Sequence, residues 1–375
     1  MLAMKQSFLI LVFIVCVSCN YSTENKTSTK SIASSKSELP YPQSEQITSF
    51  TMDTARISIG HGDNWAITWA ENNKQYSFFT DGTGFGGFPA KDEDHIEVSS
   101  GMVELDGNPE QLDTRDILSE TGTILGLGGN ETKKVSGLVM IDTVLYAWIR
   151  NLNLEGMPKG TGSTLMYSDD YGENWEWVDW NFPEIGYPTW LNAGKNYADA
   201  KDNYAYFISP DGPSAYADYP DILMGRVHKD SILFKESYVF YSGLKNEAAP
   251  QWRKFSQRKP ILTDAGGVFR PDIVYNPGID RYMLSVSSPF GDWSWWANKN
   301  PNRKPHFAIY DSPNPWAPWT TVYYKEDWGQ PENRFAPHIP PKWISEDGKS
   351  FYLLYSCIPT GPYQFNLQRV ELTLK

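Results

Sequence analysis

The sequence predicts an all-β protein built as a single β-propeller, most simply with five blades. Short runs of β-forming residues recur along the chain and are separated by Gly, Pro, Asn and Asp, a pattern typical of sandwiches, barrels and propellers. Long helical periodicity is missing. The segment Ser168–Trp175 fits S-x-D-x-G-x-x-W, which is typical of hairpin turns in propeller blades and therefore favours a propeller. With roughly 330 ordered residues and about 40 to 65 per blade, five to seven blades fit, and we expect five.

The first 19 residues predict an export signal. Lys5 is followed by the apolar run Phe8–Val17, which is too short to span a membrane. The sequence Val17-Ser18-Cys19 resembles a bacterial lipobox, with Cys19 as the lipidated first residue of the mature chain. Cys16 stands where Leu is commoner, so a plain cleaved signal stays an alternative. We expect an exported protein: an outer-membrane lipoprotein at the cell surface or facing the periplasm, or a secreted protein.

Residues 20–46 predict a disordered tether, because they are rich in Ser, Thr, Lys, Asn and Glu and carry few apolar residues. We expect the propeller to occupy residues 47–375, with a short helix over Pro109–Ser119. Its clearest strand-forming runs are Arg56–Ile59, Leu138–Ile149, Tyr204–Ile208, Tyr238–Tyr241, Asp272–Tyr275, Tyr282–Val286, Phe307–Tyr310 and Phe351–Cys357.

The segment His61–Phe88 interleaves carboxylates, aromatic residues and glycines. Ala66–Trp69 and Gln75–Phe79 read as two strands joined at Asn72-Asn73, so the local prediction is a β-hairpin. Asp63 and Asp81 flank this hairpin at the same end. Two neighbouring carboxylates are the arrangement that acid/base chemistry on a sugar needs. The alternative is that both aspartates only form turns.

Composition favours a carbohydrate partner. Aromatic residues make up 15% of the chain, and aromatic faces can stack on sugar rings. The formal net charge of -12 argues against nucleic acid, which is bound through Lys and Arg. Trp293, Trp295 and Trp296, with Trp316 and Trp319, could provide a sugar platform.

Several segments together resemble one bacterial propeller family, long known only as a domain of unknown function, whose relatives include mycobacterial endo-D-arabinanases. These segments are GDNWAITWA, TDGTGFGG, VLYAWIRN, SDDYGENW, TWLNAGKNYADA, YFISPDGPSAY, GGVFRPDIVYNPGIDRY and AIYDSPNPWAPW. SDDYGENW is also similar to the Asp-box of sialidases, where it has a structural role. The resemblance covers nearly all of residues 57–356. It implies a five-bladed propeller with a glycan site on its axis that includes Asp63 and Asp81. His61 departs from the small residue expected before Gly-Asp-Asn-Trp.

The same segments supply cationic, amide and phenolic side chains that follow strands or open turns, where binding residues concentrate. We expect the catalytic residues to be Asp63, Asp81, Arg150, Tyr197, Arg270, Tyr275 and His338. We expect the substrate-binding residues to be Trp65, Asn151, Asn192, Lys195, Asp211 and Tyr216. The alternatives for these residues are surface ion pairs, solvated charges and packing.

Three functions fit this set of residues. The first is β-elimination of a uronate-containing, ulvan-like polysaccharide, in which a cation neutralises the substrate carboxylate and a Tyr or His moves the proton. The second is endo-glycoside hydrolysis by two of Asp63, Asp81 and Asp211. The third is non-catalytic glycan binding at a cell surface. The number of cations in an otherwise acidic protein favours the lyase slightly.

No cofactor is predicted, because the chain lacks HExxH, CxxC, P-loop and GxSxG motifs. No metal site is predicted either, although a structural or catalytic divalent cation stays open. The expected partner is a polysaccharide or oligosaccharide. We expect a monomer that meets a membrane only through its lipid anchor.

Overall fold

The computed structural model describes residues 39–375 except 89, 93–94, 97, 127–131, 218, 247–248, 289–304, 329–330 and 358–362, with only the backbone of 90–92 and 95–96. The signal, Cys19, most of the tether, and Trp293, Trp295 and Trp296 therefore lie outside the described residues. Strands dominate the described part, whose helices are the short 3-10 turns η1 (Lys195–Tyr197), η2 (Lys229–Ser231), η3 (Lys235–Ser237), η4 (Phe255–Gln257) and η5 (Pro341–Trp343). None of the helices described is long and apolar enough to cross a membrane.

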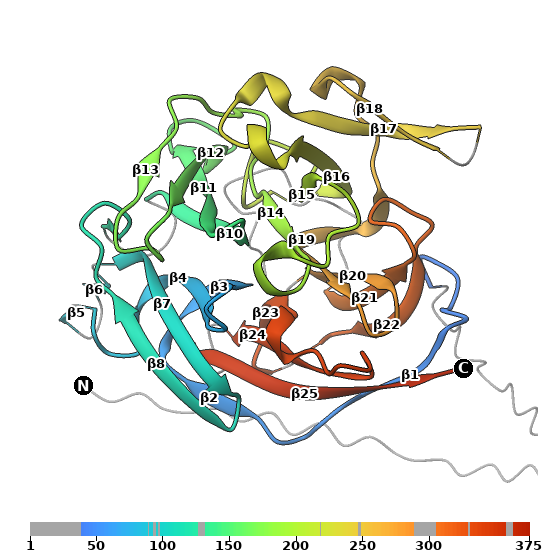
Figure 1. Ribbon diagram of the computed structural model, residues 1–375, viewed down its shortest axis with the longest axis horizontal. Coiled ribbons are helices and arrows are strands. Elements are labelled where there is room, and N and C mark those ends of the chain that lie inside the picture. Colours follow the sequence, from blue (N-terminus) through green and yellow to red (C-terminus); the bar gives the residue numbers. More distant parts are fainter. Residues whose placement is uncertain are drawn as a thin grey trace, which may run out of the picture. The chain divides into compact units, whose positions relative to one another are not determined.

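The described strands form five blades around a central axis (Figure 1). Blade 1 contains β3 (His61–Trp69), β4 (Gln75–Gly84), β7 (Val98–Asn108), β8 (Gln111–Ile117) and β9 (Ile124–Leu125). Blade 2 contains β10 (Lys134–Ile141), β11 (Val144–Asn153), β12 (Thr161–Ser168) and β13 (Glu176–Trp177). Blade 3 contains β14 (Thr189–Asn192), β15 (Tyr204–Pro210), β16 (Tyr219–His228), β17 (Val239–Lys245) and β18 (Ala249–Arg253).

The last two blades complete the ring. Blade 4 contains β19 (Leu262–Asn276), β20 (Arg281–Ser288), β21 (His306–Ser312) and β22 (Thr320–Glu326). Blade 5 contains β23 (Arg334–His338), β24 (Ser350–Cys357), β25 (Phe365–Leu374), β1 (Ile47–Met52) and β2 (Ile57–Ile59). A separate two-stranded ribbon is formed by β5 (Ala90–Asp92) and β6 (His95–Ile96). The inner strands contact one another in a closed circle, in the order β3, β10, β14, β19, β23 and back to β3. The prediction of a five-bladed all-β propeller is confirmed.

The ring is closed by strands from both ends of the propeller. β1 pairs antiparallel with β25, where Phe50 is opposite Leu372. Phe50 also stacks on Tyr323 of blade 4, with 4.4 Å between ring centroids. Ahead of β1, Tyr41 donates a hydrogen bond to the Thr263 carbonyl at 3.1 Å. The N-terminal segment thus contributes the outer strand of blade 5.

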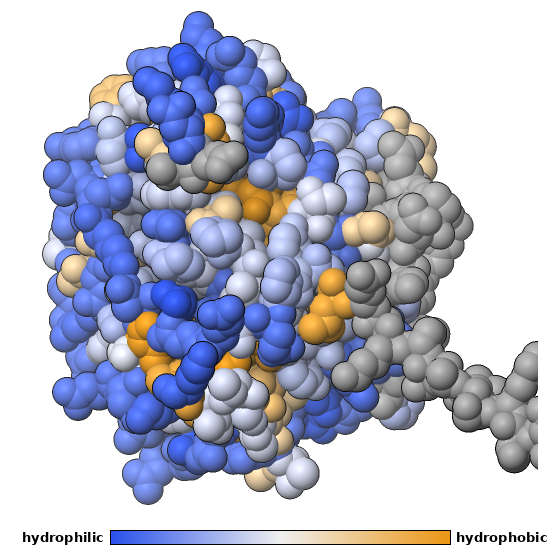
Figure 2. All heavy atoms as spheres, turned by 90° about the vertical axis from the view of Figure 1, so that its right-hand side faces the viewer, coloured by the Kyte–Doolittle hydropathy of each residue, from blue (hydrophilic) through white to orange (hydrophobic). Residues whose placement is uncertain are grey.

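The hydrophobic core lies mainly between neighbouring blades. One cluster joins blades 2, 3 and 4, and within it Trp148 stacks on Trp190 at a centroid distance of 5.1 Å. Other clusters lie between blades 1 and 2, between blades 4 and 5, and between blades 5 and 1. In the view of Figure 2 the surface is mainly hydrophilic, with hydrophobic residues confined to small patches.

The predicted hairpin is confirmed, because β3 pairs antiparallel with β4. The helix predicted over Pro109–Ser119 is wrong. Gln111–Ile117 forms β8, whose side chains alternate between exposed and less exposed positions, the period of a strand. The run predicted as one strand over Leu138–Ile149 is two strands, joined by a tight turn at Asp142 and Thr143 with φ of 48° and 71°.

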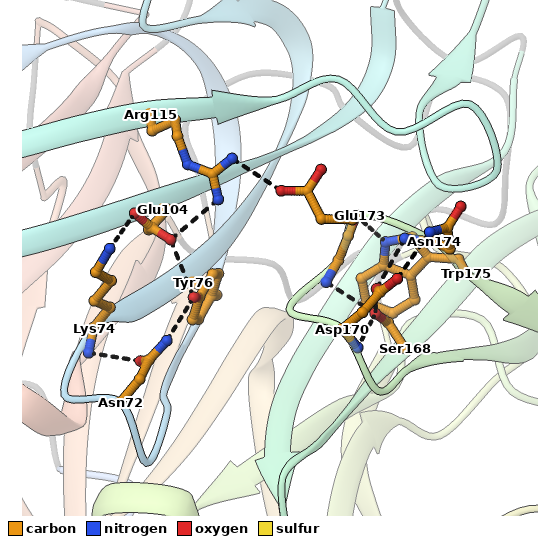
Figure 3. Close-up of polar contacts among 11 residues, drawn as sticks. Asn72, Lys74, Tyr76, Glu104, Arg115, Ser168, Asp170, Glu173, Asn174 and Trp175 are labelled. Carbon is orange, nitrogen blue, oxygen red and sulfur yellow. Dashed lines mark hydrogen bonds and ion pairs between the residues drawn. The ribbon is translucent and has the colours of Figure 1, made fainter.

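The turn Ser168–Trp175 connects β12 to β13 and packs against blade 1 (Figure 3). Asp170 accepts hydrogen bonds from the Asn174 backbone N–H at 2.9 Å and from the Ser168 hydroxyl at 2.8 Å. The buried Trp175 donates its indole N–H to the Gly172 carbonyl at 3.0 Å. Glu173 pairs with Arg115 of blade 1 at 2.9 Å. This turn therefore fastens blade 2 to blade 1.

Candidate functional site

Irregular backbone gathers within inner strands β3, β19 and β23 and in the second halves of β4 and β11. The strand residues Asn64, Asp81, Asn151, Arg270 and Ala336 all have positive φ, between 48° and 64°. The strand register shifts at or beside four of these residues, in β3, β11, β19 and β23. Such bulges turn side chains out of the regular alternation. Each left-handed non-glycine residue costs roughly 1–3 kcal/mol, and strain of this kind concentrates at functional sites.

Asp63 and Asp81 lie together at one end of blade 1, as the sequence predicts. Asp63 is opposite Thr80 in the β3–β4 pair. It accepts hydrogen bonds from the Thr80 hydroxyl and from Asn64 Nδ2, the latter at 3.0 Å. Both aspartates are buried. Gly82 allows the two strands to approach, because a Cβ at this position would lie 2.1 Å from the His61 carbonyl oxygen.

Asp81 forms an ion pair with Lys134, the first residue of β10, through its Oδ2. Its Oδ1 is buried and has no hydrogen-bond partner among the described residues. Burial raises the pKa of Asp81 to about 6, the positive charge of Lys134 opposes this rise, and the negative charge of Asp63 adds to it. A carboxyl group with this pKa is partly protonated near neutral pH and can act as an acid.

Arg150 and Arg270 meet across the axis over the rings of two tyrosines. Arg270 Cζ lies 4.4 Å from the Tyr187 ring centroid and 5.4 Å from that of Tyr216. Arg150 Cζ lies 5.4 Å and 5.3 Å from the same two centroids. All four side chains are buried. Stacking on aromatic faces suits the flat guanidinium group and holds both cations in fixed positions.

Tyr216 receives two hydrogen bonds at its hydroxyl oxygen, from Arg150 Nη1 at 2.7 Å and from Asn151 Nδ2 at 2.8 Å. Burial acts to raise the pKa of Tyr216, but the charges of Arg150, Lys134 and Arg270 outweigh burial and lower the pKa below its usual value. The pKa of Tyr187 is raised, chiefly by burial. The pKa values of the two phenols are therefore shifted in opposite directions.

We call these residues the axial cluster: Asp63, Asp81, Lys134, Arg150, Asn151, Tyr187, Tyr216 and Arg270. Three cations face two carboxylates, so the cluster has a local excess of positive charge in a chain whose net charge is -12. Arg270 Nε, Arg270 Nη1 and Arg150 Nε are buried and have no hydrogen-bond partner within the described part of the chain. Buried guanidinium nitrogens without partners are costly, so the cluster is suited to an anionic ligand.

Sequence reasoning missed Lys134 and Tyr187. In the sequence, the pair Lys133-Lys134 suggests two solvated surface charges. In the structure, Lys134 is the first residue of β10, a strand that is buried throughout. Tyr187 precedes β14 and donates a hydrogen bond to Asn64 Oδ1 at 3.3 Å. Tyr363 is a further neighbour, because its hydroxyl bonds to Asp63 and its pKa is raised well above normal, chiefly by burial. A lysine at the start of an apolar strand is the signal that could have identified Lys134.

Four predicted residues lie at the opposite ends of the inner strands. Asn192 ends β14 and bonds to the Thr68 hydroxyl at 2.7 Å, and Lys195 begins η1 beyond it. The Tyr197 hydroxyl is held by the backbone of Tyr204 and Tyr206. Tyr275 lies near the end of β19 and donates to Asp280 Oδ1 at 2.8 Å. Because β14 and β19 run parallel, these residues are separated along the axis from Tyr187 and Arg270.

Three further predicted residues have other partners. Trp65 is fully buried in the core between blades 5 and 1, beside Phe79 and Phe365. Asp211 forms an ion pair with Arg258 at 2.8 Å. His338 of β23 forms a buried pair with Asp272 of β19, with 3.2 Å between His338 Nδ1 and Asp272 Oδ1. The structure thus does not bring Trp65, Asp211 or His338 into the axial cluster.

Among the described residues, no group of three or more His, Cys, Asp or Glu side chains is placed to hold a metal ion. No family model matches the chain, and no curated protein matches it. The resemblance to the arabinanase-containing family therefore stays an expectation.

Solved structures with a similar chain path have low sequence identity to this protein. A Bacteroides ovatus protein is 10% identical, with a TM-score of 0.49 over 84% of this chain and 87% of its own. A GH43_1 enzyme from Xanthomonas citri is 11% identical, with a TM-score of 0.44 over 85% and 92%. A protein of unknown function from Dyadobacter fermentans is 10% identical, with a TM-score of 0.46 over 87% and 100%.

Proposed function

We propose that this protein is an exported glycoside hydrolase that cleaves an acidic, uronate-containing polysaccharide at the axial cluster. The observation that carries the proposal is the buried pair Asp63 and Asp81, in which Asp81 has a pKa of about 6. Glycoside hydrolysis needs one carboxylic acid and one carboxylate with different protonation. Both groups come from one hairpin of a rigid blade.

Asp81 is the proposed acid. In its protonated form it gives its proton to the glycosidic oxygen as the bond to the anomeric carbon breaks, and Asp63 acts as the base for water or as the nucleophile. Proton transfer leaves Asp81 as a carboxylate beside the Lys134 ammonium. Lys134 thereby stabilises the charge that develops on Asp81 during the reaction, which is more effective in a water-poor site than in solvent.

Arg150 and Arg270 are proposed to bind a carboxylate of the substrate. Their stacked positions and unpartnered nitrogens match the planar, bidentate geometry that arginine offers to a carboxylate. A uronate satisfies these nitrogens and balances the positive excess of the cluster. We therefore favour an acidic polysaccharide of the ulvan type over a neutral one.

A second candidate is β-elimination at the same site, and the hydrogen bonding of Tyr216 favours it specifically. Arg150 and Asn151 donate to the Tyr216 oxygen, which stabilises a phenolate able to take the proton next to a uronate carboxylate. We rank this chemistry second because two of its expected acid/base residues, Tyr197 and Tyr275, lie at the other end of the inner strands.

Product analysis separates these functions. Ulvan, alginate, pectate and their carboxyl-reduced forms are digested, and reducing ends are measured beside the ultraviolet absorbance of unsaturated uronates. Reducing ends without the chromophore support hydrolysis, and we expect Asp63→Asn and Asp81→Asn to abolish it while Tyr216→Phe retains activity. The chromophore, lost in Tyr216→Phe, supports elimination. If none of these polymers is cleaved, both proposals fail and glycan binding alone remains.

We expect Arg270→Ala to lower kcat/KM about a hundred- to a thousand-fold on the acidic polymer, because a preorganised charge at the substrate is lost. On the carboxyl-reduced polymer the wild type and the variant should have similar rates. A matched control is Arg226→Ala, since Arg226 is stacked between Tyr204 and Trp252 in blade 3. An equal loss on both polymers contradicts a carboxylate-binding role.

Export and lipid attachment at Cys19 are proposed from the leader sequence. In a host that processes lipoproteins, the wild type should carry lipid and enter the membrane fraction, whereas Cys19→Ala should enter the soluble fraction. An unacylated, soluble wild type rejects the lipobox.

A further inference from the structure

A cavity lies at the other ends of the inner strands, away from the axial cluster. Its volume is about 450 Å³, within the usual range of ligand pockets. It is lined by residues near the ends of β3 and β19 and by residues of the segments that follow β14, β19 and β23, strands whose labels surround the centre of the ring in Figure 1. The residues used below are Trp69, Gly194, Asp199, Tyr275, Pro341 and Glu346. We call this cavity the distal cavity.

Two aromatic rings of the distal cavity are held in place. The half-buried Trp69 donates its indole N–H to Asn73 Oδ1 at 3.2 Å. The Tyr275 hydroxyl donates to Asp280, and the Tyr275 ring packs on Tyr282 with 4.9 Å between centroids. Fixed aromatic rings bind a ligand with little loss of side-chain entropy.

Asp199 supplies a carboxylate beside these rings. Gly194 has φ of 68°, and a Cβ there would lie 1.9 Å from Asp199 Oδ2, so the carboxylate rests over a position that only glycine can fill. In the described part of the chain no hydrogen bond to the Asp199 carboxylate is seen. Although Asp199 is exposed overall, partial desolvation of its carboxylate raises the pKa of Asp199. The exposed Glu346 provides a second carboxylate at the cavity.

We propose that the distal cavity binds neutral sugar units of a glycan chain. The partly exposed Trp69 ring offers an apolar face to the C–H groups of a sugar, and carboxylates accept hydrogen bonds from its hydroxyl groups. Among the described residues that line the cavity there is no Lys or Arg. The nearby Lys201 lies 5.0 Å from the Tyr275 ring centroid and pairs with Asp280. A uronate or sulfate would meet Asp199 and Glu346 without a balancing cation, so the distal cavity excludes anionic sugars.

This site is independent of the proposed hydrolase function, because it uses different residues at the other end of the inner strands. It lets one propeller hold a neutral stretch of glycan while the axial cluster engages an acidic one. The chemistry of the two ends is therefore complementary along a polysaccharide that contains both kinds of sugar.

Calorimetric titration tests the proposal. Full-length protein carrying Asp63→Asn, which prevents cleavage under the hydrolase proposal, is titrated with cellohexaose, xylohexaose, mannohexaose and arabinohexaose. We expect at least one hexasaccharide to bind. Trp69→Ala should weaken this binding about tenfold because a ring face is lost. Asp199→Asn should also weaken it about tenfold because a charged hydrogen-bond acceptor is lost. Trp177→Ala is the matched control, because Trp177 is exposed on blade 2, and it should leave binding unchanged.

Other outcomes overturn the proposal. One is the absence of binding by all four hexasaccharides at millimolar concentration. Another is binding that survives Trp69→Ala and Asp199→Asn but is lost in Arg150→Ala, which assigns the sugar to the axial cluster. Tighter binding of a fully deacetylated chitosan hexamer assigns the cavity to cations instead. If circular dichroism shows that Trp69→Ala is unfolded, Asp199→Asn and Glu346→Gln decide, since both side chains are exposed. Loss of polysaccharide cleavage alone has no bearing on this result.

Discussion

At the scale of single residues, Asp81 is the proposed acid of the reaction and also lowers the free energy of unfolding at neutral pH. Its pKa of about 6 in the folded chain exceeds the ordinary value of 3.8. Between these pH values the folded state binds more protons than the unfolded state, so the free energy of unfolding falls as pH rises from about 4 to about 6, by up to roughly 3 kcal/mol. The native state keeps Asp81 buried at the expense of stability at neutral pH.

The pH dependence of catalysis tests the role of Asp81 as the acid. We expect kcat/KM to fall above about pH 6, because Asp81 must be protonated to donate. Lys134→Met removes the charge that lowers this pKa, so the alkaline limb should move to higher pH. The measurement is kcat/KM from pH 4 to pH 9 for the wild type and the variant.

The conservative change Lys134→Arg is the control for this profile. It keeps the positive charge, so its alkaline limb should stay near that of the wild type even if its rate is lower. A limb that is unaffected by Lys134→Met assigns the titration to another group.

Residues of the axial cluster could be predicted where they lie next to strands that the sequence pattern identifies. Asp63, Asp81, Arg150, Asn151, Tyr216 and Arg270 were all expected, and the structure brings them together. Asn192, Lys195, Tyr197 and Tyr275 follow strands in the same way. The sequence alone does not show at which end of the propeller axis each strand end lies. Asn192, Lys195, Tyr197 and Tyr275 therefore could not be separated from the residues of the axial cluster.

At the scale of elements, the Ser168–Trp175 turn is held by internal hydrogen bonds and contacts blade 1 through the Glu173–Arg115 ion pair and the packing of Trp175 on Phe78. We expect Asp170→Ala to lower the free energy of unfolding by about 1 kcal/mol, because Asp170 accepts from the Asn174 backbone and from Ser168. Urea unfolding measures the change. Asp169→Ala is the matched control, since Asp169 is exposed and adjacent. Equal losses from both variants contradict the assigned role.

Strands were predicted better than their irregularities. The Gln75–Phe79 and Phe351–Cys357 runs are strands because aromatic residues, which favour strands, cluster there. The segment Gln111–Ile117, for which the sequence predicts a helix, is a strand because it pairs along its whole length with β7, and such pairing outweighs local preference. Bulges such as that at Arg270 depend on neighbouring strands and leave no local pattern.

At the scale of the whole molecule, closure of the ring depends on β1. We expect removal of residues 1–38 to leave the melting temperature unchanged, since the propeller begins after them. Removal of residues 1–52 exposes the edge of β25 and uncovers Phe351, against which Phe50 packs. This shorter chain should melt at least several degrees lower or aggregate. Differential scanning calorimetry of both truncations measures the effect, and equal melting temperatures contradict a closing role for β1.

The pairing of β1 with β25 also sets the order of events during synthesis. Phe50 is opposite Leu372. The outer strand of blade 5 therefore cannot pair until β25 has been translated, about 320 residues later. At typical elongation rates this delay is roughly 15 to 65 seconds. The ring cannot close on a partly translated chain, and the last blade is completed only after nearly all of the propeller has left the ribosome.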